Sequence, residues 1–321
     1  MIRIGIDLGS NSIRLINEEK ILFNEPCLIA LDKKNHVLAI GNEAAELKEN
    51  KDQSIQIISP ITSVQINFEA LDLLLEQICY EFKVFKAFQK TILLLSYPTT
   101  LAKEYCDILK QHMLDLGAFR VYFEKEIWFS AIGAGLNLTL PITHCMMNIG
   151  SSNCDIAIFS NGIVQNASEL PLSGNHVLLT IKKWLKQERN FNISYTELDR
   201  IQRKIGNVVW QQNPKNIEVQ GTSILTKDKK IITIHENELV PLLKNYVEQW
   251  SQWIIEFIHS LNKEQQEDIK RQGIVACGGT MKLHGLAAEL TKRTGYLIFI
   301  TEDPVHTVAR GIQILLSNMN I

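Results

Sequence analysis

The chain has 321 residues, of which 45% are hydrophobic and 21% are charged, and its formal net charge is −2. This composition is typical of a globular protein long enough for two domains. The near-neutral charge gives no bulk attraction to nucleic acid, so we expect no nucleic-acid partner. The sequence has no apolar run of membrane-spanning length and starts with a strand rather than a signal peptide, so we expect a cytoplasmic protein.

The six cysteines are scattered, none in a Cys-x-x-Cys pair, and most lie in apolar stretches. We expect buried free thiols in a reducing compartment. The eight histidines have no ligand-like spacing to cysteines or acidic residues, so a structural zinc site is not expected.

The first element is an apolar strand that ends in Asp7 and turns through Gly9-Ser10-Asn11-Ser12 into a second strand. Glycine at position 9 can adopt a positive φ and lets a phosphate approach the backbone. The amides of such a turn can form an anion-binding nest, and Asp7 can hold a hydrated Mg²⁺ beside it. An ordinary hairpin with a polar tip fits these residues equally well.

The next elements alternate between strands and helices. Short strands are expected at 27–31 and 37–40 around a polar turn at 32–35, then a helix capped by Asn42 and a charged loop at 48–54. Apolar spacing predicts a helix over 68–82 and a buried strand over 91–95. A helix over 100–116, a strand over 120–123 and a packed helix over 126–136 follow.

The opening pattern is repeated at residues 145–156, with Asn148 in the position of Asp7 and a turn at Gly150-Ser151-Ser152-Asn153. The dipeptide Asn161-Gly162 then predicts a tight hairpin turn. Two copies of one unit imply two similar domains that face each other. Two facing hairpin tips would hold phosphates better than one, so the repeat indicates nucleotide binding between two lobes.

The remaining elements continue the second copy. Helices are expected over 174–187 and 195–205, a small sheet insertion over 208–236, and a long amphipathic helix over 237–261 with Trp250 and Trp253 in the core. A strand at 273–277 runs into the glycine turn at 278–279, followed by a helix over 283–291, a strand over 297–300 and a helix over 307–316. There is no low-complexity linker, which suits hinged closure around a ligand.

Taken in order, these motifs resemble the actin-like ATPase superfamily and, within it, the bacterial rod-shape MreB family. The resemblance rests on residues 7–12, 24–26, 131–136, 199–202, 278–281 with 285–286, and 302–304 with 308–311. It implies an α/β fold of two ribonuclease H-like domains facing a nucleotide cleft, each with a smaller subdomain. Domain I would cover 1–144, with a subdomain near 30–62 and the helix 305–321 returning to it. Domain II would cover 145–304, with a subdomain near 182–240.

The resemblance also implies ATP or ADP and Mg²⁺ as ligands. Glu126 falls at the catalytic glutamate that orients water, and Asp7 would hold Mg²⁺ through water, with Asn148 at the second metal position. The residues implied for nucleotide binding are Gly9, Ser10, Asn11, Ser12, Gly150, Ser151, Ser152, Asn153, Asp199, Arg200, Ile201, Gln202, Gly278, Gly279, Thr280 and Met281. Without the resemblance, Glu126 would simply be an exposed acid at a helix N-terminus.

Several positions depart from the family pattern. Asn148 replaces an aspartate, Ser151-Ser152 replace glycines, Asn153-Cys154 replace threonines, Asn175 replaces an aspartate, Ile127 a proline and Thr280 a glycine. An amide is a weaker Mg²⁺ ligand than a carboxylate. Losing one electrostatic partner costs on the order of 10²-fold in rate, so we expect nucleotide binding with slow ATP hydrolysis.

Residues 82–90 interleave three phenylalanines with three lysines between a helix and a strand. In some MreB-type proteins a hydrophobic loop from this region inserts into the inner membrane face, which suggests Val84, Phe85 and Phe88 as a membrane loop. The alternative is that the phenylalanines cap the domain core.

The resemblance therefore implies an ATP-binding cytoskeletal protein that forms head-to-tail filaments with itself at the inner face of the cytoplasmic membrane. Its other partners would be the cell-wall or shape machinery. Two alternatives stay open. One is a nucleotide-binding scaffold without hydrolysis. The other is an exopolyphosphatase-like phosphohydrolase, because Gly9–Ser12 with Arg14 also resembles the opening of exopolyphosphatases.

Overall fold

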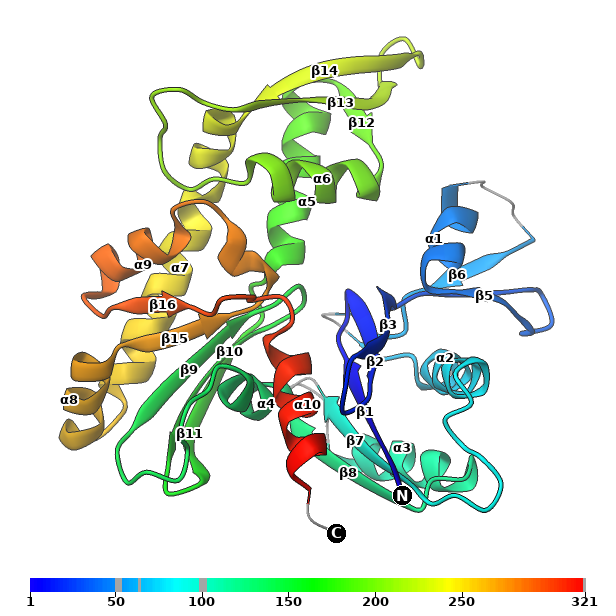
Figure 1. Ribbon diagram of the computed structural model, residues 1–321. Coiled ribbons are helices and arrows are strands. Elements are labelled where there is room, and N and C mark those ends of the chain that lie inside the picture. The colour runs from blue at the N-terminus through cyan, green and yellow to red at the C-terminus, as the bar shows by residue number, and fades with distance from the viewer. Residues whose placement is uncertain (50–53, 63–64, 98–102, 320–321) are drawn as a thin grey trace. The chain divides into compact units, whose positions relative to one another are not determined.

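The structure is a computed structural model that describes residues 1–49, 54–62, 65–97 and 103–319. The chain divides into two compact units, unit 1 (residues 1–137 and 306–321) and unit 2 (residues 138–305) (Figure 1). We predicted a boundary at 144/145. The segment from Leu138 belongs to unit 2 because the carbonyls of Leu138 and Leu140 accept hydrogen bonds from Gly162 N–H (2.6 Å) and Asn161 N–H (2.9 Å).

Unit 1 is built on a five-stranded sheet of order β3-β2-β1-β7-β8. The first three strands are antiparallel, and β1, β7 and β8 are parallel. The strands are β1 (Ile2–Leu8), β2 (Ser12–Ile16), β3 (Ile21–Pro26), β7 (Thr91–Tyr97) and β8 (Arg120–Lys125). Parallel strands align their carboxyl ends at one edge of the sheet, where ligands of α/β proteins bind.

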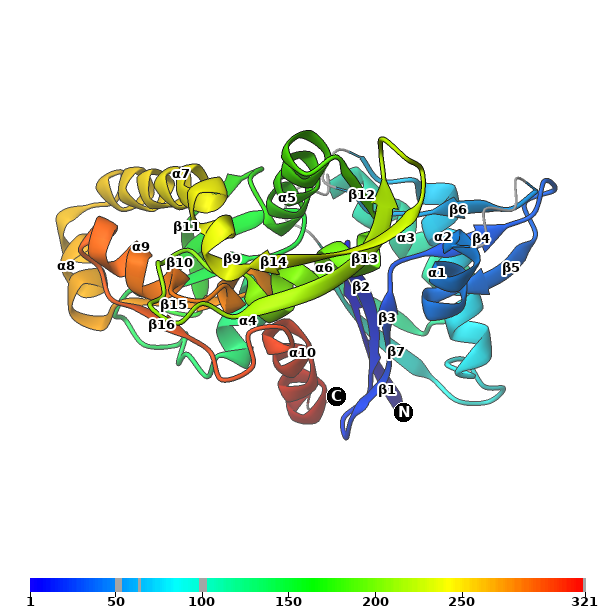
Figure 2. The same cartoon turned by 90° about the horizontal axis from the view of Figure 1, so that it is seen from above.

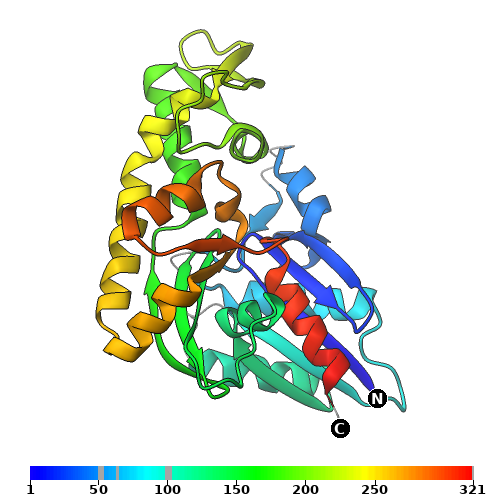
Figure 3. The ribbon, with the colours of Figure 1, turned by 60° about the vertical axis from the view of Figure 1, so that its left-hand side comes forward.

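Helices cover both faces of this sheet. On one face α2 (Phe68–Glu81) and α3 (Lys103–Asp115) pack on the apolar side chains of β1. On the other face lie α4 (Glu126–Gly133) and α10 (Thr307–Asn318), and Figure 3 shows α10 alongside β1. A methyl group on Gly133 or Gly311 would collide with the backbone of the facing helix, so glycine permits the close contact of α4 and α10. Residues 100–102 of the helix predicted over 100–116 lie outside the described residues.

A second sheet of unit 1 contains β4 (Ile29–Leu31), β5 (Val37–Ile40) and β6 (Gln56–Ile58), in the order β5-β4-β6. The polar turn between β4 and β5 is confirmed, because the Asp32 carboxylate accepts hydrogen bonds from the Lys34 and His36 amides. The predicted cap at Asn42 is wrong. Helix α1 (Gly41–Glu49) begins one residue earlier, and the Glu25 carboxylate accepts from the Asn42 amide (2.9 Å). Residues 50–53 of the predicted loop lie outside the described residues.

Unit 2 repeats the sheet of unit 1, in the order β11-β10-β9-β15-β16. Here too an antiparallel trio is followed by parallel strands. The strands are β9 (His144–Ile149), β10 (Cys154–Ser160), β11 (Ile163–Leu170), β15 (Ile274–Cys277) and β16 (Ile298–Ile300). The turn residues Asn161 (φ 51°) and Gly162 (φ 80°) are both left-handed, as the predicted tight hairpin requires. The internal repeat in the sequence is thus a repeat of topology.

The core of unit 2 lies between this sheet and helices α5 (Gly174–Glu188) and α7 (Leu239–His259), which lie on the same side of β9 and β10 (Figure 2). Trp250 and Trp253 are core residues, as predicted, and their indole N–H groups donate to the Leu172 carbonyl (2.8 Å) and Ser168 Oγ (2.9 Å). Helices α8 (Lys263–Gln272) and α9 (Leu286–Thr294) and the short η2 (Gly279–Lys282) complete the layer.

A three-stranded sheet of order β12-β13-β14 lies near the start of α7 in Figure 1. It consists of β12 (Phe191–Ile193), β13 (Asn216–Ser223) and β14 (Lys229–His235), with α6 (Tyr195–Ile205) packed on it and η1 (Glu236–Glu238) leading into α7. All six cysteines are buried free thiols, as predicted. Within the described residues, no helix has the length and apolarity needed to cross a membrane.

Candidate functional site

The first hairpin tip of unit 1 joins β1 to β2 through Gly9, Ser10 and Asn11, with Ser12 as the first residue of β2. Gly9 does not use a left-handed φ. Glycine is required there for another reason, since a Cβ at this position would lie 2.7 Å from the Ser12 carbonyl oxygen. The tip is therefore a narrow turn in which the backbones of Gly9 and Ser12 lie close together.

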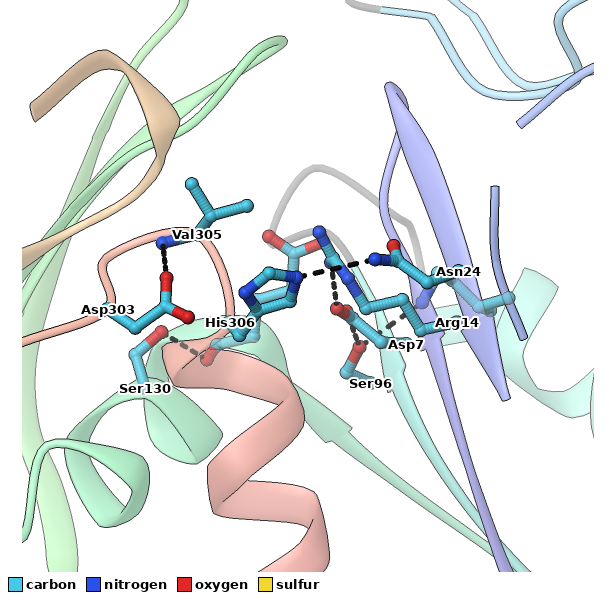
Figure 4. A network of polar contacts seen from close by, with 10 residues as sticks. Asp7, Arg14, Asn24, Ser96, Ser130, Asp303, Val305 and His306 are labelled. Carbon is cyan, nitrogen blue, oxygen red and sulfur yellow. Dashed lines mark hydrogen bonds and ion pairs between the residues drawn. The ribbon is translucent and has the colours of Figure 1, made fainter. Parts of the chain in front are cut away.

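Directly beneath this tip, Asp7 is held by two neighbours (Figure 4). Arg14 Nη1 donates to one carboxylate oxygen at 2.6 Å, and Ser96 Oγ donates to the other at 2.7 Å. The Leu8 amide donates in turn to Ser96 Oγ (3.3 Å). Asp7 is 2% exposed and Arg14 is 8% exposed, so this is a buried ion pair.

These side chains form a row across the sheet. Asn24, Arg14, Asp7 and Ser96 are successive register partners on β3, β2, β1 and β7, and directly opposed residues share one face of a sheet. Asn24 Nδ2 lies 3.3 Å from His306 Nε2, at the residue before α10. Ser96 was not among the predicted site residues, and Arg14 was considered only for an alternative function. Residues equidistant from a hairpin turn face each other, and this symmetry could have paired Arg14 with Asp7.

The second hairpin tip, Gly150–Asn153 in unit 2, is clamped by four hydrogen bonds. The Gly150 carbonyl accepts from Gly174 N–H (3.0 Å) and from Thr280 Oγ1 (3.0 Å). The Ser151 carbonyl accepts from Asn175 N–H (2.9 Å) and from Ser173 Oγ (2.7 Å). The start of α5 and the loop before α9 therefore fix the tip from the same side.

The clamp determines where the tip amides point. In a planar trans peptide the N–H points opposite to the C=O, so the amides of Ser151 and Ser152 point away from the clamp. Ser152 is buried, and its Oγ has no hydrogen-bond partner among the described residues. A buried polar atom without a partner calls for a ligand or water. The tip thus has two amides directed away from the clamp and one buried hydroxyl without a partner among the described residues, which suits phosphate oxygens.

The glycine loop after β15 lies next to this tip. Gly278 has a φ of 95°, and a Cβ there would collide with the Ile149 carbonyl and lie 2.5 Å from Asn148 Oδ1. Gly279 faces open space, whereas the Thr280 and Met281 side chains are buried. Of the four predicted loop residues, Thr280 therefore supports the tip and Met281 packs in the core.

The row at the base of this second tip differs from that of unit 1. Asn148 faces Asp155 on β10 and Cys277 on β15, and all three side chains are buried. An amide and a carboxylate therefore stand where unit 1 has an acid and a guanidinium. Asp155 was not among the predicted site residues.

Helix α6 carries the residues predicted for ribose and adenine. Asp199 pairs with Arg203 (2.6 Å), and Arg200 pairs with Glu197 (2.7 Å), whose pKa it holds below its usual range by hydrogen bonding. Ile201 is fully buried, and Gln202 is half-buried. Tyr195, the first residue of α6, donates to Asn175 Oδ1 (3.2 Å) and so connects this helix to the clamp of the second tip.

Glu126 is the first residue of α4 and is half-buried. The partial positive charge of a helix N-terminus favours a carboxylate at this position. The Ile127 side chain that follows it is buried in unit 1, and Ser130 Oγ donates to the Glu126 carbonyl (2.9 Å). The backbone that carries the glutamate is therefore well fixed.

The predicted membrane loop is only partly exposed. Val84 is 3% exposed and Phe85 packs against the core of unit 1, so these two side chains support the domain. Phe88 is fully exposed and has a φ of 65°, in a segment that carries Lys86 and Lys90. Single exposed apolar side chains are normal on protein surfaces, so the exposure of Phe88 alone assigns it no partner.

Comparisons with known proteins assign the family. The sequence model of the MreB/Mbl protein family matches residues 1–321. The cell shape-determining protein Mbl of Bacillus subtilis is 27% identical over 320 residues, which cover 99% of this chain and 96% of Mbl.

Solved structures agree. Crystal structures of MreB5 of Spiroplasma citri, bound to AMPPNP and to ADP, match with a TM-score of 0.90 and 26% identity over 98% of this chain and 95% of theirs. A MamK double helical filament matches with a TM-score of 0.82 over 99% of this chain and 100% of MamK, but at 15% identity it supports the fold alone. This chain therefore belongs to the MreB/Mbl family, whose relatives determine cell shape, and has the actin-like ATPase fold.

Proposed function

We propose that this chain is an ATP- and ADP-binding cytoskeletal protein that polymerises into membrane-associated filaments and helps determine cell shape or the placement of wall synthesis. The observation that supports nucleotide binding most directly is the clamped tip at Gly150–Asn153, with its outward amides and spare Ser152 hydroxyl. The match to MreB5, which was crystallised with AMPPNP and with ADP, supports the same ligand class.

In this proposal the hairpin tip of each unit is a phosphate-binding element. Gly9–Ser12 and Gly150–Asn153 supply backbone amides and hydroxyls, which bind anions without a formal charge. Gly278, Gly279 and the exposed side of α6 bind the adenosine, and Gly279 has open space for it. Thr280 holds the second tip in place through its hydrogen bond to Gly150.

The magnesium ion that the family resemblance implies fits these residues poorly. Both carboxylate oxygens of Asp7 already accept hydrogen bonds, from Arg14 and Ser96, and position 148 offers a neutral amide. Among the described residues there is no group of three or more His, Cys, Asp or Glu side chains that could hold a metal ion. The proposal therefore assigns phosphate binding to the residues of the chain itself.

The proposed function includes slow hydrolysis of the bound ATP. Glu126 would orient or deprotonate the attacking water from the N-terminus of α4. Glu126→Ala should lower phosphate release by about 10²-fold or more, in line with the usual effect of a general base. The matched control is Glu104→Ala, which removes an exposed carboxylate from the first turn of α3 in the same unit. If Glu126→Ala released phosphate at the unaltered rate, Glu126 would have no part in the hydrolysis.

Filament formation and membrane binding are tested together by sedimentation. The purified protein is centrifuged with ATP or ADP, with and without liposomes that contain anionic lipid. We expect the protein to pellet in the presence of ATP. We also expect it to be recovered with the liposomes when these are separated by flotation. Protein that neither binds nucleotide nor pellets in any of these conditions would contradict the proposed function.

Phe88 is the side chain that the proposal places in the membrane, since an apolar wedge between cations suits an anionic interface. Burying a phenylalanine is worth about 1.5–3 kcal/mol, so Phe88→Ser should weaken liposome binding by roughly tenfold or more. Trp210→Ser is the control, because Trp210 is a similarly large exposed side chain in unit 2. Equal losses in the two variants would exclude a specific role for Phe88.

A further inference from the structure

The polar row beneath the first hairpin tip contains a positively charged side chain, the guanidinium of Arg14. Arg14 lies two residues after Ser12, at the end of the tip, and its register partner is Asp7. In the row Asn24–Arg14–Asp7–Ser96, the other members are an acid and two neutral side chains. The guanidinium is therefore the only positive charge among these four positions, and Figure 4 shows it beside Asp7.

Each oxygen of the Asp7 carboxylate is bound by a protein neighbour, and one of these neighbours is a cation. The two oxygens accept from Arg14 Nη1 at 2.6 Å and from Ser96 Oγ at 2.7 Å, and Ser96 Oγ is itself fixed by the Leu8 amide. A charge-assisted hydrogen bond of this length is among the stronger kinds in proteins. The negative charge that would attract a hydrated metal ion is thus already neutralised.

Arg14 retains donors that its protein neighbours do not use. A guanidinium has five N–H groups, and the structure shows Nη1 bound to Asp7. Its buried Nε has no hydrogen-bond partner among the described residues, although the side chain is more than nine-tenths buried. Arginine is well suited to binding phosphate through a fork of donors. A phosphate oxygen is the ligand that this combination of a fixed charge and an unpartnered Nε donor favours.

We propose that the Arg14 guanidinium is the resident cation of the phosphate site at Gly9–Ser12, so that this chain binds ATP without a divalent metal ion. The inference rests on the proposed nucleotide binding. The ligand class is a nucleoside di- or triphosphate, whose negative charge Arg14 partly neutralises. Asp7 then acts as a positioning residue, which holds the guanidinium in place from the adjacent strand.

The test is the affinity for a fluorescent ATP analogue, measured by anisotropy with the full chain in excess Mg²⁺ and in excess EDTA. For the unaltered protein, the two dissociation constants should agree within about threefold. In Arg14→Leu, the affinity in EDTA should fall by about tenfold or more, which corresponds to about 1.4 kcal/mol. Arg3→Leu is the control, because Arg3 belongs to the same sheet but pairs with Glu18 at a more exposed position.

Two further variants keep the test decisive if Arg14→Leu does not fold. Arg14→Lys keeps the charge and loses the fork, so it should bind more weakly while remaining insensitive to EDTA. The double variant Asp7→Asn/Arg14→Gln removes both charges but keeps hydrogen-bonding groups, and it should lose affinity in EDTA. Binding of the unaltered protein that drops about 100-fold in EDTA, or an Arg14 variant that binds in EDTA as well as the Arg3 control, would overturn the inference. Absence of binding in both buffers would instead contradict the proposed nucleotide function itself.

Discussion

The buried ion pair between Asp7 and Arg14 predicts a large and specific loss of stability. In Arg14→Leu the Asp7 carboxylate stays 97–98% buried with only Ser96 as a partner. Removing one partner of a buried ion pair costs about 3–5 kcal/mol, because the remaining charge is left without compensation. Unit 1 has roughly 150 residues, for which 1 kcal/mol shifts the melting temperature by about 2–4 °C. The expected fall is therefore about 6–20 °C, measured by differential scanning calorimetry without nucleotide.

A second ion pair in the same sheet provides the comparison. Arg3 pairs with Glu18 at 2.8 Å, but the two side chains are 23% and 44% exposed. Exposed pairs are worth about 0.2–1 kcal/mol, so Arg3→Leu should lower the melting temperature by only a few degrees. The double variant Asp7→Asn/Arg14→Leu should recover about 1–3 kcal/mol relative to Arg14→Leu, because no charge is left buried. If Arg14→Leu were no worse than Arg3→Leu, the pair would not be a structural element of the site and the reasoning above would fail.

Two further predictions concern the backbone and the thiols. Gly278→Ala forces an alanine into a left-handed φ against the backbone of β9, so it should lower the free energy of unfolding by about 1–3 kcal/mol. Gly279→Ala lies in open space and should change the free energy of unfolding by no more than about 0.5 kcal/mol. Equal losses for the two variants in chemical denaturation would contradict this assignment. Burial raises the pKa of Cys27 and of Cys79 to about 12, whereas unfolded thiols ionise near pH 8.5. The contribution of these thiols to the free energy of unfolding is therefore fully present below about pH 8.5 and is lost as the pH rises toward 12. The loss is about 2 kcal/mol per thiol at pH 10, and Cys27→Ala should flatten the decline in melts between about pH 8 and pH 10.

Elements with a strong apolar period could be predicted from the sequence. The helix over Phe68–Glu81 and the helix over Tyr195–Ile205 bury one regular stripe each, and their bounds agree with the prediction to within a residue. The hairpin at Asn161-Gly162 was predictable because only a few residue types adopt two successive positive φ angles.

Helix α8 was missed because it buries very little. Only Asp268 and Ile269 are buried among its ten residues, so no apolar stripe exists to detect. Its stability comes from the Asn262 capping box and from Asp268, whose carboxylate accepts from the Thr143 amide (2.9 Å). The start of α1 was misplaced for a related reason, since its first turn is capped by Glu25 from a distant strand. Long-range caps leave no local signal in the sequence.

The sequence indicates the two candidate tips but not the layer of side chains beneath them. Glycine and serine at 9–12 and 150–153 are visible as motifs, whereas the base of each tip depends on which residues face each other across strands. Register converts Asp7 and Arg14, seven residues apart, into direct partners, and adds Ser96 from a strand nearly ninety residues away. A motif search examines neighbours in sequence and therefore overlooks this layer.

The two units show why this layer matters for chemistry. Their sheets have the same strand order and place the same positions at the base of the tip, so the fold imposes the positions and leaves the charges free to change. Unit 1 has an acid opposite a guanidinium, and unit 2 has an amide opposite an acid. A fold that buries such a row tolerates a charge only with a partner nearby, because an isolated buried charge is costly. Arginine at position 14 therefore gives the buried Asp7 carboxylate a partner of opposite charge on the adjacent strand, while the strand order of the sheet is the same in both units.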